Sequence, residues 1–501
     1  MRDQQNMNCP RIIIAGLSGG SGKTITSLGL TRALARSGKA IKPFKKGPDY
    51  IDAQWLSLAA RVSATNLDAY LLPRAVLRLL FRTCSAAYEG ALIEGNRGIF
   101  DGKDLSGSYS TAELARIIEA PVVLVMDCTK MTRTAAALVR GIIDFEPDVR
   151  IAGVILNRTA NDRHRAILRD AIEQHTGLPV LGALPKLRHN PLPERHMGLI
   201  SDQEYAMSHS VLDMLADLIQ RHVDVDRFWE IACSAAPLKE DGPPTAEDVV
   251  AAGGGPVPLP DVWSTAISAL PSDSPSVRIG YVRDAALWFY YEENLEALRR
   301  AGAELIALSI LHDAPWPDLD GLYLGGGFPE TQAEQLSRNT AIRAHVKAVA
   351  ENGMPIYAEC GGLMYLGQGL IYQDKHYPMV GVLPVTTRLC ERPQGLGYIE
   401  ATVTAENPYH PLGSVIRGHE FHYSRCIVND DADPVFCLRI EKGNSCMGSE
   451  RDGMVAGNVF ASYLHLFALG EPHWAVRFVQ AADRYRNNNL SSPHGSRIPE
   501  T

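Results

Sequence analysis

Residues 16–24 read Gly-Leu-Ser-Gly-Gly-Ser-Gly-Lys-Thr and follow the apolar run 12–15. In such a loop, glycines let backbone N–H groups turn inward to hold phosphate oxygens, while the lysine neutralises charge and the threonine hydroxyl can bind Mg²⁺. Five residues separate the first glycine from the one before the lysine, where the standard P-loop has four. The stretch predicts a nucleotide-phosphate site made by Gly19, Gly20, Ser21, Gly22, Lys23 and Thr24.

Short, continuous apolar runs recur after this loop, and helix-like segments separate them. Runs of this kind are typical of strands buried on both faces, so they predict βαβ units and a parallel sheet. Each run ends on a glycine loop or a polar residue, namely Glu94, Asp127 or Asn157. Because ligands of open α/β sheets bind at the carboxyl ends of strands, we expect these residues to face a ligand. The runs are 12–15, 92–93, 122–126 and 154–156.

The composition changes near residue 234, where Pro, Gly, Ala and Ser become frequent up to about residue 276. Such a composition predicts a linker between two domains. A second α/β series follows, with apolar runs at 277–281, 305–308, 322–324 and 355–358. We therefore predict an N-terminal domain at 9–233, a linker at 234–276, a C-terminal domain at 277–485 and a polar tail at 486–501.

The overall composition narrows the class of protein. The 501 residues carry a formal charge of −8, which argues against a nucleic-acid binder that relies on bulk charge. No apolar run approaches the roughly 18 residues that span a bilayer, and the N-terminus shows no signal-peptide pattern. Nine scattered cysteines without a CxxC pair are typical of reduced thiols. These features predict a cytoplasmic enzyme with several domains.

Four carboxylates are expected on strand-end loops near the phosphate loop. They are Asp49 and Asp52, which follow Lys45-Lys46-Gly47-Pro48, and Glu94 and Asp101, which bracket residues 95–100. Clustered carboxylates repel one another unless Mg²⁺ or another cation offsets their charge, so they are candidate metal ligands. The alternative for Asp49 and Asp101 is that each only caps a turn, beside Pro48 and Gly102.

Cys360 lies in Ala-Glu-Cys-Gly-Gly, directly after an apolar run and before a helix-forming one. Small residues on both sides of a nucleophile permit the strained strand-to-helix turn of a nucleophile elbow. A helix N-terminus at that place favours the thiolate. Upstream, residues 325–327 are three glycines that could donate N–H groups to an oxyanion, and downstream His465 is a candidate base.

A second histidine cluster, Gly418-His419-Glu420-Phe421-His422, also invites a metal-binding interpretation. It has no third ligand at helical spacing, so we favour histidines that are structural or contact a substrate.

In combination, these motifs resemble the cobyrinate a,c-diamide synthase family of glutamine amidotransferases, from about residue 11 to 486. The N-terminal half looks like its dethiobiotin-synthetase-like ATP domain and the C-terminal half like its class I amidotransferase domain. The N-terminal matches are residues 16–24, 43–52, 66–68, 98–102, 156–158 and 194–199. The C-terminal matches are residues 289–291, 325–330, 359–362, 418–423 and 462–465.

The resemblance implies a role for each matched position. Cys360 and His465 would release ammonia from glutamine, with Gly327 and Gly361 holding the oxyanion. ATP would phosphorylate a carboxylate of a tetrapyrrole substrate, and ammonia would displace the acyl phosphate. Mg²⁺ would be held by Thr24, Asp52 and Glu94. Asn157 would bind adenine, and Tyr50 and Asp101 would lie near the tetrapyrrole.

Two features depart from the common pattern. Phe467 occupies the place, two residues after the histidine, where most class I amidotransferases have an acid; the cobyrinate family generally lacks that acid, so the resemblance implies a Cys–His dyad. Asn96-Arg97 replaces two residues that are usually apolar in cobyrinate enzymes. Arg97 could pair with an additional substrate carboxylate, as in a siroheme amidase.

Two other functions compete with amide synthesis from glutamine. A P-loop switch ATPase would need no glutaminase, and a synthetase that uses free ammonia would need no intact Cys360 and His465. Both residues are present, which favours the glutamine-dependent ligase. We expect a tetrapyrrole as the small-molecule partner and neither nucleic acid nor a membrane, and a homodimer is compatible with the sequence.

Overall fold

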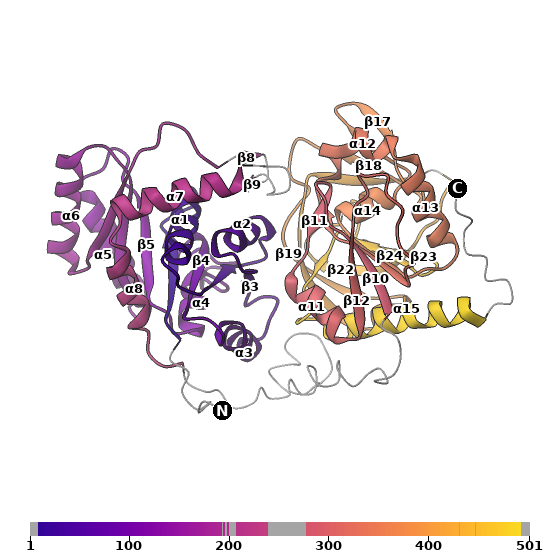
Figure 1. The fold of residues 1–501 in the computed structure, drawn as a ribbon, viewed down its shortest axis with the longest axis horizontal. Coiled ribbons are helices and arrows are strands. Elements are labelled where there is room, and N and C mark those ends of the chain that lie inside the picture. Colours follow the sequence, from indigo (N-terminus) through magenta and orange to yellow (C-terminus); the bar gives the residue numbers. More distant parts are fainter. Residues whose placement is uncertain are drawn as a thin grey trace. The chain divides into compact units, whose positions relative to one another are not determined.

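The computed structural model describes residues 9–192, 194–195, 198–199, 207–238, 277–429, 431–445 and 447–491. The chain divides into two compact units, residues 1–242 and 243–501 (Figure 1). Of the expected linker, residues 239–276 lie outside the described residues, and so do residues 492–501 of the expected tail. Part of the matched stretch 194–199 also lies outside them, although its backbone forms the antiparallel pair β8 (Glu194–Arg195) and β9 (Gly198–Leu199).

Unit 1 is built on a seven-stranded sheet of order β3-β2-β4-β1-β5-β6-β7. Every pair of neighbouring strands is parallel, which confirms the predicted fold class. Strand β1 lies between β4 and β5, so the phosphate loop leaves the sheet near its middle. The strands are β1 (Arg11–Gly16), β2 (Ile41–Lys46), β3 (Thr65–Leu67), β4 (Gly90–Gly98), β5 (Val122–Asp127), β6 (Ile151–Thr159) and β7 (Val180–Pro185).

Helices cover this sheet and exclude water from its centre. Ile12 and Ile14 of β1 share one buried cluster with Leu30 of α1, Ile219 of α7 and Phe228 of α8. The intervening side chains of the central strands are buried as well, as expected for strands covered on both faces. The helices are α1 (Lys23–Arg36), α2 (Tyr50–Ala60), α3 (Arg74–Ser85), α4 (Thr111–Ile117), α5 (Thr134–Phe145), α6 (Asp162–Thr176), α7 (Ser208–His222) and α8 (Val225–Cys233).

Strand β2 was not predicted, because its sequence Ile-Lys-Pro-Phe-Lys-Lys has three lysines and no apolar run. All six of its residues are nevertheless buried. Lys42 donates a hydrogen bond to the Ser63 carbonyl, and Lys45 forms ion pairs, so partners offset the desolvation of these ammonium groups.

Unit 2 contains a mixed ten-stranded sheet of order β12-β10-β13-β15-β24-β23-β22-β19-β20-β25. The first five strands are parallel, and the remaining pairs are antiparallel. The predicted runs became β10, β12, β13 and β15, whereas the antiparallel part was not predicted. The strands are β10 (Val277–Val282), β12 (Ala303–Leu308), β13 (Gly321–Leu324), β15 (Ile356–Glu359), β19 (Gly395–Val403), β20 (Val415–His422), β22 (Val435–Lys442), β23 (Arg451–Ala456), β24 (Val459–Ser462) and β25 (His465–Leu466).

Smaller elements complete unit 2. A two-stranded sheet joins β11 (Leu287–Phe289) to β14 (Gly326–Gly327), and a four-stranded sheet contains β16 (Gly369–Tyr372), β17 (Lys375–Pro378), β18 (Val385–Leu389) and β21 (Ser424–Val428). The helices are α11 (Glu292–Arg300), α12 (Ala333–Arg338), α13 (Thr340–Glu351), α14 (Gly361–Leu366) and α15 (His473–Ser491), with a 3₁₀ turn at Pro329–Gln332. Among the described residues, no helix is long and apolar enough to cross a membrane.

Alternation along the parallel strands gives unit 2 two cores. Ile356 and Ala358 of β15 enter the core that includes α13 and α14, whereas Tyr357 between them enters the core of α11 and α15. Helix α15 contributes Trp474 and Phe478 to the second core and extends to Ser491, six residues beyond the expected domain boundary.

Glu471, just before α15, gives unit 2 a pH-dependent stability. It is 3% exposed, and burial raises the pKa of its carboxyl to about 7. The folded protein therefore keeps a proton that the unfolded chain loses above the ordinary pKa of 4.5. This proton contributes fully to the stability of unit 2 below pH 4.5, and the contribution is lost as the pH rises through 7. We expect Glu471→Gln, which cannot ionise, to be more stable than the wild type by about 2–3 kcal/mol at pH 8 and little changed at pH 4.5.

Urea unfolding at both pH values measures this difference. Glu351→Gln, on an exposed face of α13, is the matched control and should follow the wild type at both values. Equal stability of Glu471→Gln and wild type at pH 8 would contradict the prediction.

Candidate active sites

The phosphate loop joins β1 to α1, and two of its glycines have backbone conformations that other residues rarely adopt. Gly20 has φ 73°, and Gly22, the N-cap of α1, has φ 96°. The loop is braced internally, because the Ser21 hydroxyl and the Lys23 ammonium both donate to the Ser18 carbonyl, at 2.7 and 2.9 Å. These internal hydrogen bonds therefore define the shape of the loop.

Asn157, at the end of β6, lies against this loop. Its Nδ2 donates to the Ser21 carbonyl at 2.9 Å, and its Oδ1 accepts from the Arg158 N–H at 2.9 Å. A Cβ at Gly22 would lie 2.1 Å from the same Nδ2, so only glycine fits there. These contacts give Asn157 a part in shaping the loop, and its expected contact with adenine stays a prediction.

A cavity of about 480 Å³ opens beside the loop. Its wall includes basic side chains that the sequence analysis had not identified as site residues, among them Arg158, which pairs with Asp127 at 2.6 Å. Asp127 ends β5, and Asn157 pairs with it near the end of β6. The position of Arg158, directly after Asn157, was the signal in the sequence that could have identified it. The lining residues are Gly20, Gly22, Lys23, Thr24, Ile25, Asp52, Asn157, Arg158, Lys186, Leu187, His189, Asn190 and Leu192.

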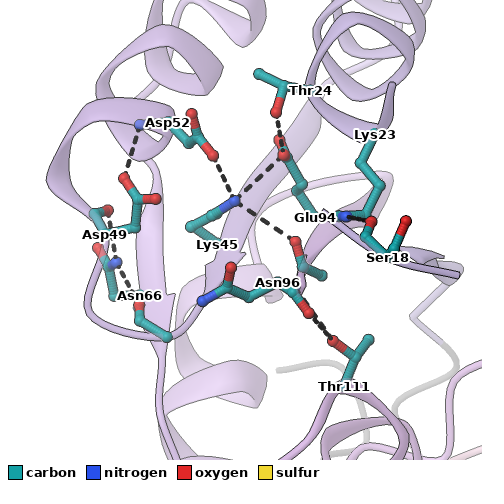
Figure 2. Close-up of polar contacts among 12 residues, drawn as sticks. Ser18, Lys23, Thr24, Lys45, Asp49, Asp52, Asn66, Glu94, Asn96 and Thr111 are labelled. Carbon is teal, nitrogen blue, oxygen red and sulfur yellow. Dashed lines mark hydrogen bonds and ion pairs between the residues drawn. The ribbon is translucent and has the colours of Figure 1, made fainter. Parts of the chain in front are cut away.

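A cluster of opposite charges lies beside the phosphate loop (Figure 2). Glu94, which we expected on a strand-end loop, lies inside β4, because this strand continues to Gly98 and pairs there with β1. The Lys45 Nζ is 2.6 Å from Asp52 Oδ2 and 3.2 Å from Glu94 Oε1. Glu94 Oε1 also accepts a hydrogen bond from the Thr24 hydroxyl at 2.8 Å. The cluster thereby joins β2, β4 and the first turns of α1 and α2. Lys45 was not among the predicted site residues, because a charged residue in a strand gives no apolar signal.

Burial and mutual repulsion set the charge states in this cluster. Burial, opposed by Lys45, raises the pKa of Glu94 to about 7. Burial would lower the pKa of Lys45, but Asp52 and then Glu94 outweigh it and raise that pKa, so the ammonium stays charged. Burial, followed by repulsion from Asp52, raises the pKa of Asp49 to about 6.

The expected magnesium ligands meet in this cluster. Thr24 and Glu94 are hydrogen-bonded to each other, and Asp52 reaches Glu94 through Lys45. Glu94 Oε2 is buried and has no hydrogen-bond partner among the described residues, so it is an oxygen that a cation could satisfy. Within the same part of the chain, no group of three or more His, Cys, Asp or Glu side chains could hold a metal alone. The residues fit a Mg²⁺ ion that takes its other ligands from phosphate and water.

Asp49 and Asp101 both cap turns. Asp49 is the N-cap of α2 and accepts the Asp52 N–H at 2.9 Å, whereas Asp101 accepts the Gly98 N–H at 2.8 Å. Tyr50 is the first residue of α2 and is buried. Arg97 is exposed, has φ 49°, and its side chain forms no ion pair with a described residue.

In unit 2, Cys360 occupies a strained turn between β15 and α14. Its φ of 46° and ψ of −98° are a conformation that a non-glycine residue adopts only at an energetic cost. A Cβ at Gly362 would lie 2.4 Å from the Leu324 carbonyl, so the turn requires a glycine at this position. The geometry is that of a nucleophile elbow. Burial and then Glu330 raise the pKa of the thiol, so a base must accept its proton.

The residues expected around Cys360 come together. A Cβ at Gly361 would lie 2.9 Å from the Gly327 nitrogen, so the two expected oxyanion donors are neighbours. A Cβ at Gly326 would lie 2.4 Å from His465 Cε1, which places the imidazole over the same glycine strand. The predicted nucleophile, base and N–H donors therefore lie around β14, and their roles stay predictions.

The other histidines have structural contacts. The His419 ring stacks on that of His465, with centroids 4.8 Å apart, and its Nδ1 lies 3.2 Å from the Tyr291 hydroxyl. Burial and then His465 lower the pKa of His419 well below its ordinary value, so it is neutral. His422 contacts the Ser424 carbonyl and Glu420.

Comparison with known proteins agrees with this geometry. Residues 12–200 match the model of the CobQ/CobB/MinD/ParA nucleotide binding domain, and residues 278–473 match the CobB/CobQ-like glutamine amidotransferase domain. Fold and sites thus define a nucleotide-binding glutamine amidotransferase.

Relatives extend this match over nearly the whole chain. The cobyrinate a,c-diamide synthase of Magnetococcus marinus is 40% identical, over 93% of this chain and 96% of its own. That of Archaeoglobus fulgidus is 39% identical, over 95% and 98%. The chain belongs to the cobyrinate a,c-diamide synthase family and is a glutamine-using, amide-forming ligase. This membership speaks against the switch-ATPase alternative.

The close approach at Gly22 generates a prediction. Gly22→Ala would displace the Asn157 amide and strain φ, so the loop would leave the shape in which its N–H groups converge. Restoring that shape around a phosphate should cost about 1.4 kcal/mol, which is tenfold in affinity. We expect ATP to bind about tenfold more weakly or worse, as measured by calorimetric titration. Gly141→Ala, where an added Cβ meets nothing within 4 Å, is the control and should bind ATP like the wild type. Equal ATP affinities of all three proteins would contradict the prediction.

Proposed function

We propose that the chain amidates the a and c acetate carboxylates of cobyrinate, with ATP and glutamine as co-substrates. The observation that supports this best is that one chain carries both a braced phosphate loop beside buried carboxylates and a cysteine elbow beside a buried histidine. The first arrangement suits activation of a carboxylate, and the second suits release of ammonia. The names of the relatives supply the substrate.

In unit 2, the glutaminase half-reaction uses Cys360 as nucleophile. His465 takes the thiol proton, the sulfur attacks the side-chain carbonyl carbon of glutamine, and the N–H groups of Gly327 and Gly361 hold the oxyanion. Proton transfer from His465 to the departing nitrogen releases ammonia and leaves a glutamyl thioester. Water hydrolyses the thioester to glutamate and regenerates Cys360.

In unit 1, the ligase half-reaction begins when a substrate carboxylate oxygen attacks the γ-phosphorus of ATP and ADP leaves. Gly19 to Gly22 offer N–H groups to the phosphates, and Lys23 and Lys45 supply positive charge. Thr24, Asp52 and Glu94 would hold Mg²⁺, which neutralises phosphate charge when bound. Asn157 would contact adenine, and Tyr50 and Asp101 the macrocycle. Ammonia then attacks the acyl phosphate, forming the amide and releasing phosphate.

Mass spectrometry tests this function directly. The protein is incubated with Mg-ATP, glutamine and cobyrinate, and the number of mass increments of one amidation each is counted. We expect two increments that require both ATP and glutamine. The absence of any amidation mass increment with cobyrinate would contradict the proposed function.

The two half-reactions should respond separately to substitution. We expect Cys360→Ala to lose glutamine-dependent synthesis by more than about 10³-fold while ammonia-dependent synthesis continues. Lys23→Ala should lose several kcal/mol of transition-state stabilisation and therefore fail with either nitrogen source. Steady-state rates with glutamine and with ammonium chloride measure both. A folded Cys360→Ala protein that is inactive with ammonia would contradict the division of labour.

One observation favours a second substrate, siroheme. The exposed Arg97 is available for a bidentate ion pair with a peripheral carboxylate, which an apolar residue could not form. If siroheme is preferred, its kcat/KM should exceed that of cobyrinate, and Arg97→Met should reduce this ratio about tenfold. If the ratio is unchanged by the substitution, Arg97 has no part in choosing the tetrapyrrole.

A further inference from the structure

The base of the cysteine site lacks an acid where most class I amidotransferases carry one. Phe467 fills that place, two residues after His465, and it is 1% exposed. Its ring packs edge-on against Tyr291, with centroids 4.7 Å apart. A phenyl ring cannot accept a hydrogen bond from an imidazole N–H in the way a carboxylate does, so an orienting acid has to come from another element.

A carboxylate does reach His465 from β15. Glu359 Oε2 lies 3.5 Å from His465 Nδ1, and each side chain is 1% exposed. The second oxygen, Oε1, accepts the backbone N–H of Leu466 at 3.2 Å. One carboxylate thus lies beside the imidazole and accepts a hydrogen bond from the next peptide group of β25, which ties that strand to β15.

The position of Glu359 follows from strand geometry. It is the residue before Cys360, and alternation along β15 puts it on the same face as Tyr357, in the core that also contains Leu466. Cys360 instead belongs to the core on the opposite face. The neighbours Glu359 and Cys360 can therefore belong to one site, with Cys360 at the turn as the nucleophile and Glu359 on the opposite face beside the base His465.

We propose that Glu359 is the positioning residue of the glutaminase, holding Nδ1 of His465 so that Nε2 exchanges the proton with Cys360. This inference rests on the proposed roles of Cys360 and His465 and replaces the expected dyad with a Cys–His–Glu arrangement. An acid behind the base fixes its tautomer and stabilises the imidazolium that forms when the thiol loses its proton.

The surroundings of the pair support this role. Burial raises the pKa of Glu359, while His465, the Leu466 N–H and the Tyr323 hydroxyl lower it, so its carboxylate is stabilised mainly by the groups that it would orient. On the other side of the imidazole, His419 is neutral and adds no competing positive charge. A carboxylate so deeply buried is costly to keep without a partner.

The test is Glu359→Gln, which keeps the shape and can still accept the Leu466 N–H but carries no charge. We expect glutaminase kcat to fall about 10²- to 10⁴-fold, the range for a mispositioned general base, with KM for glutamine within about threefold. Synthesis with free ammonia should be unchanged. Glu359→Asp should recover part of the rate, and Glu471→Gln, another buried glutamate of this unit, should leave it unchanged.

A readout independent of turnover accompanies the rates. The rate at which iodoacetamide alkylates Cys360 is measured by mass spectrometry at a series of pH values. This rate reports how much of the Cys360 thiol is deprotonated in the presence of its base. We expect the alkylation profile of Glu359→Gln to move to higher pH and that of Glu471→Gln to coincide with the wild type. If Glu359→Gln does not fold, Glu359→Asp carries the test, and an unshifted profile with full kcat overturns the inference.

The outcomes separate this inference from the proposed function. If Cys360→Ala keeps glutaminase activity, the proposed function fails. If Cys360→Ala loses the activity and a folded Glu359→Gln keeps kcat within threefold of the wild type, only the role of Glu359 is overturned.

Discussion

The arrangement of the nucleotide site depends on two buried ion pairs, which the Lys45 ammonium forms with Asp52 and Glu94. The ammonium joins β2 to the start of α2 and to β4, and the Thr24 hydroxyl on Glu94 adds the first turn of α1. Removal of one partner from a buried ion pair typically costs about 3–5 kcal/mol, because the other charge loses its compensation. The cluster therefore links these strands and helices and also places charged side chains beside the phosphate loop.

In unit 2 the corresponding constraint is backbone geometry. Cys360 has a positive φ, which costs about 1–3 kcal/mol, and surrounding contacts must hold it there. Its N–H donates to the Ser462 carbonyl of β24, and close contacts at Gly361 and Gly362 leave no room for side chains. The strain is localised at the residue that would perform the chemistry, as in other nucleophile elbows.

Both sites follow from one rule of parallel sheets. In each unit the reactive residues lie where parallel strands end and helices begin, and backbone N–H groups point toward that edge. In unit 1, Gly22 opens the helix behind the phosphate loop, and in unit 2 Cys360 occupies that place. Under the proposed function, the same architecture would present N–H groups to a phosphate in one unit and to an oxyanion in the other.

The sequence alone determined the fold class, because continuous apolar runs and the loop at 16–24 are local signals of a parallel P-loop sheet. It also predicted that Cys360 ends a strand, since the glycines that permit the turn are its neighbours in the chain. Which residues face one another was decided only by tertiary structure. From the sequence, Lys45 resembles a surface lysine, and only the pairing of β2 with β4 shows that it is buried beside Glu94. Glu359 resembles an ordinary strand residue, and only the position of β25 shows that it lies beside His465. Such contacts join residues distant in sequence, so no local pattern encodes them.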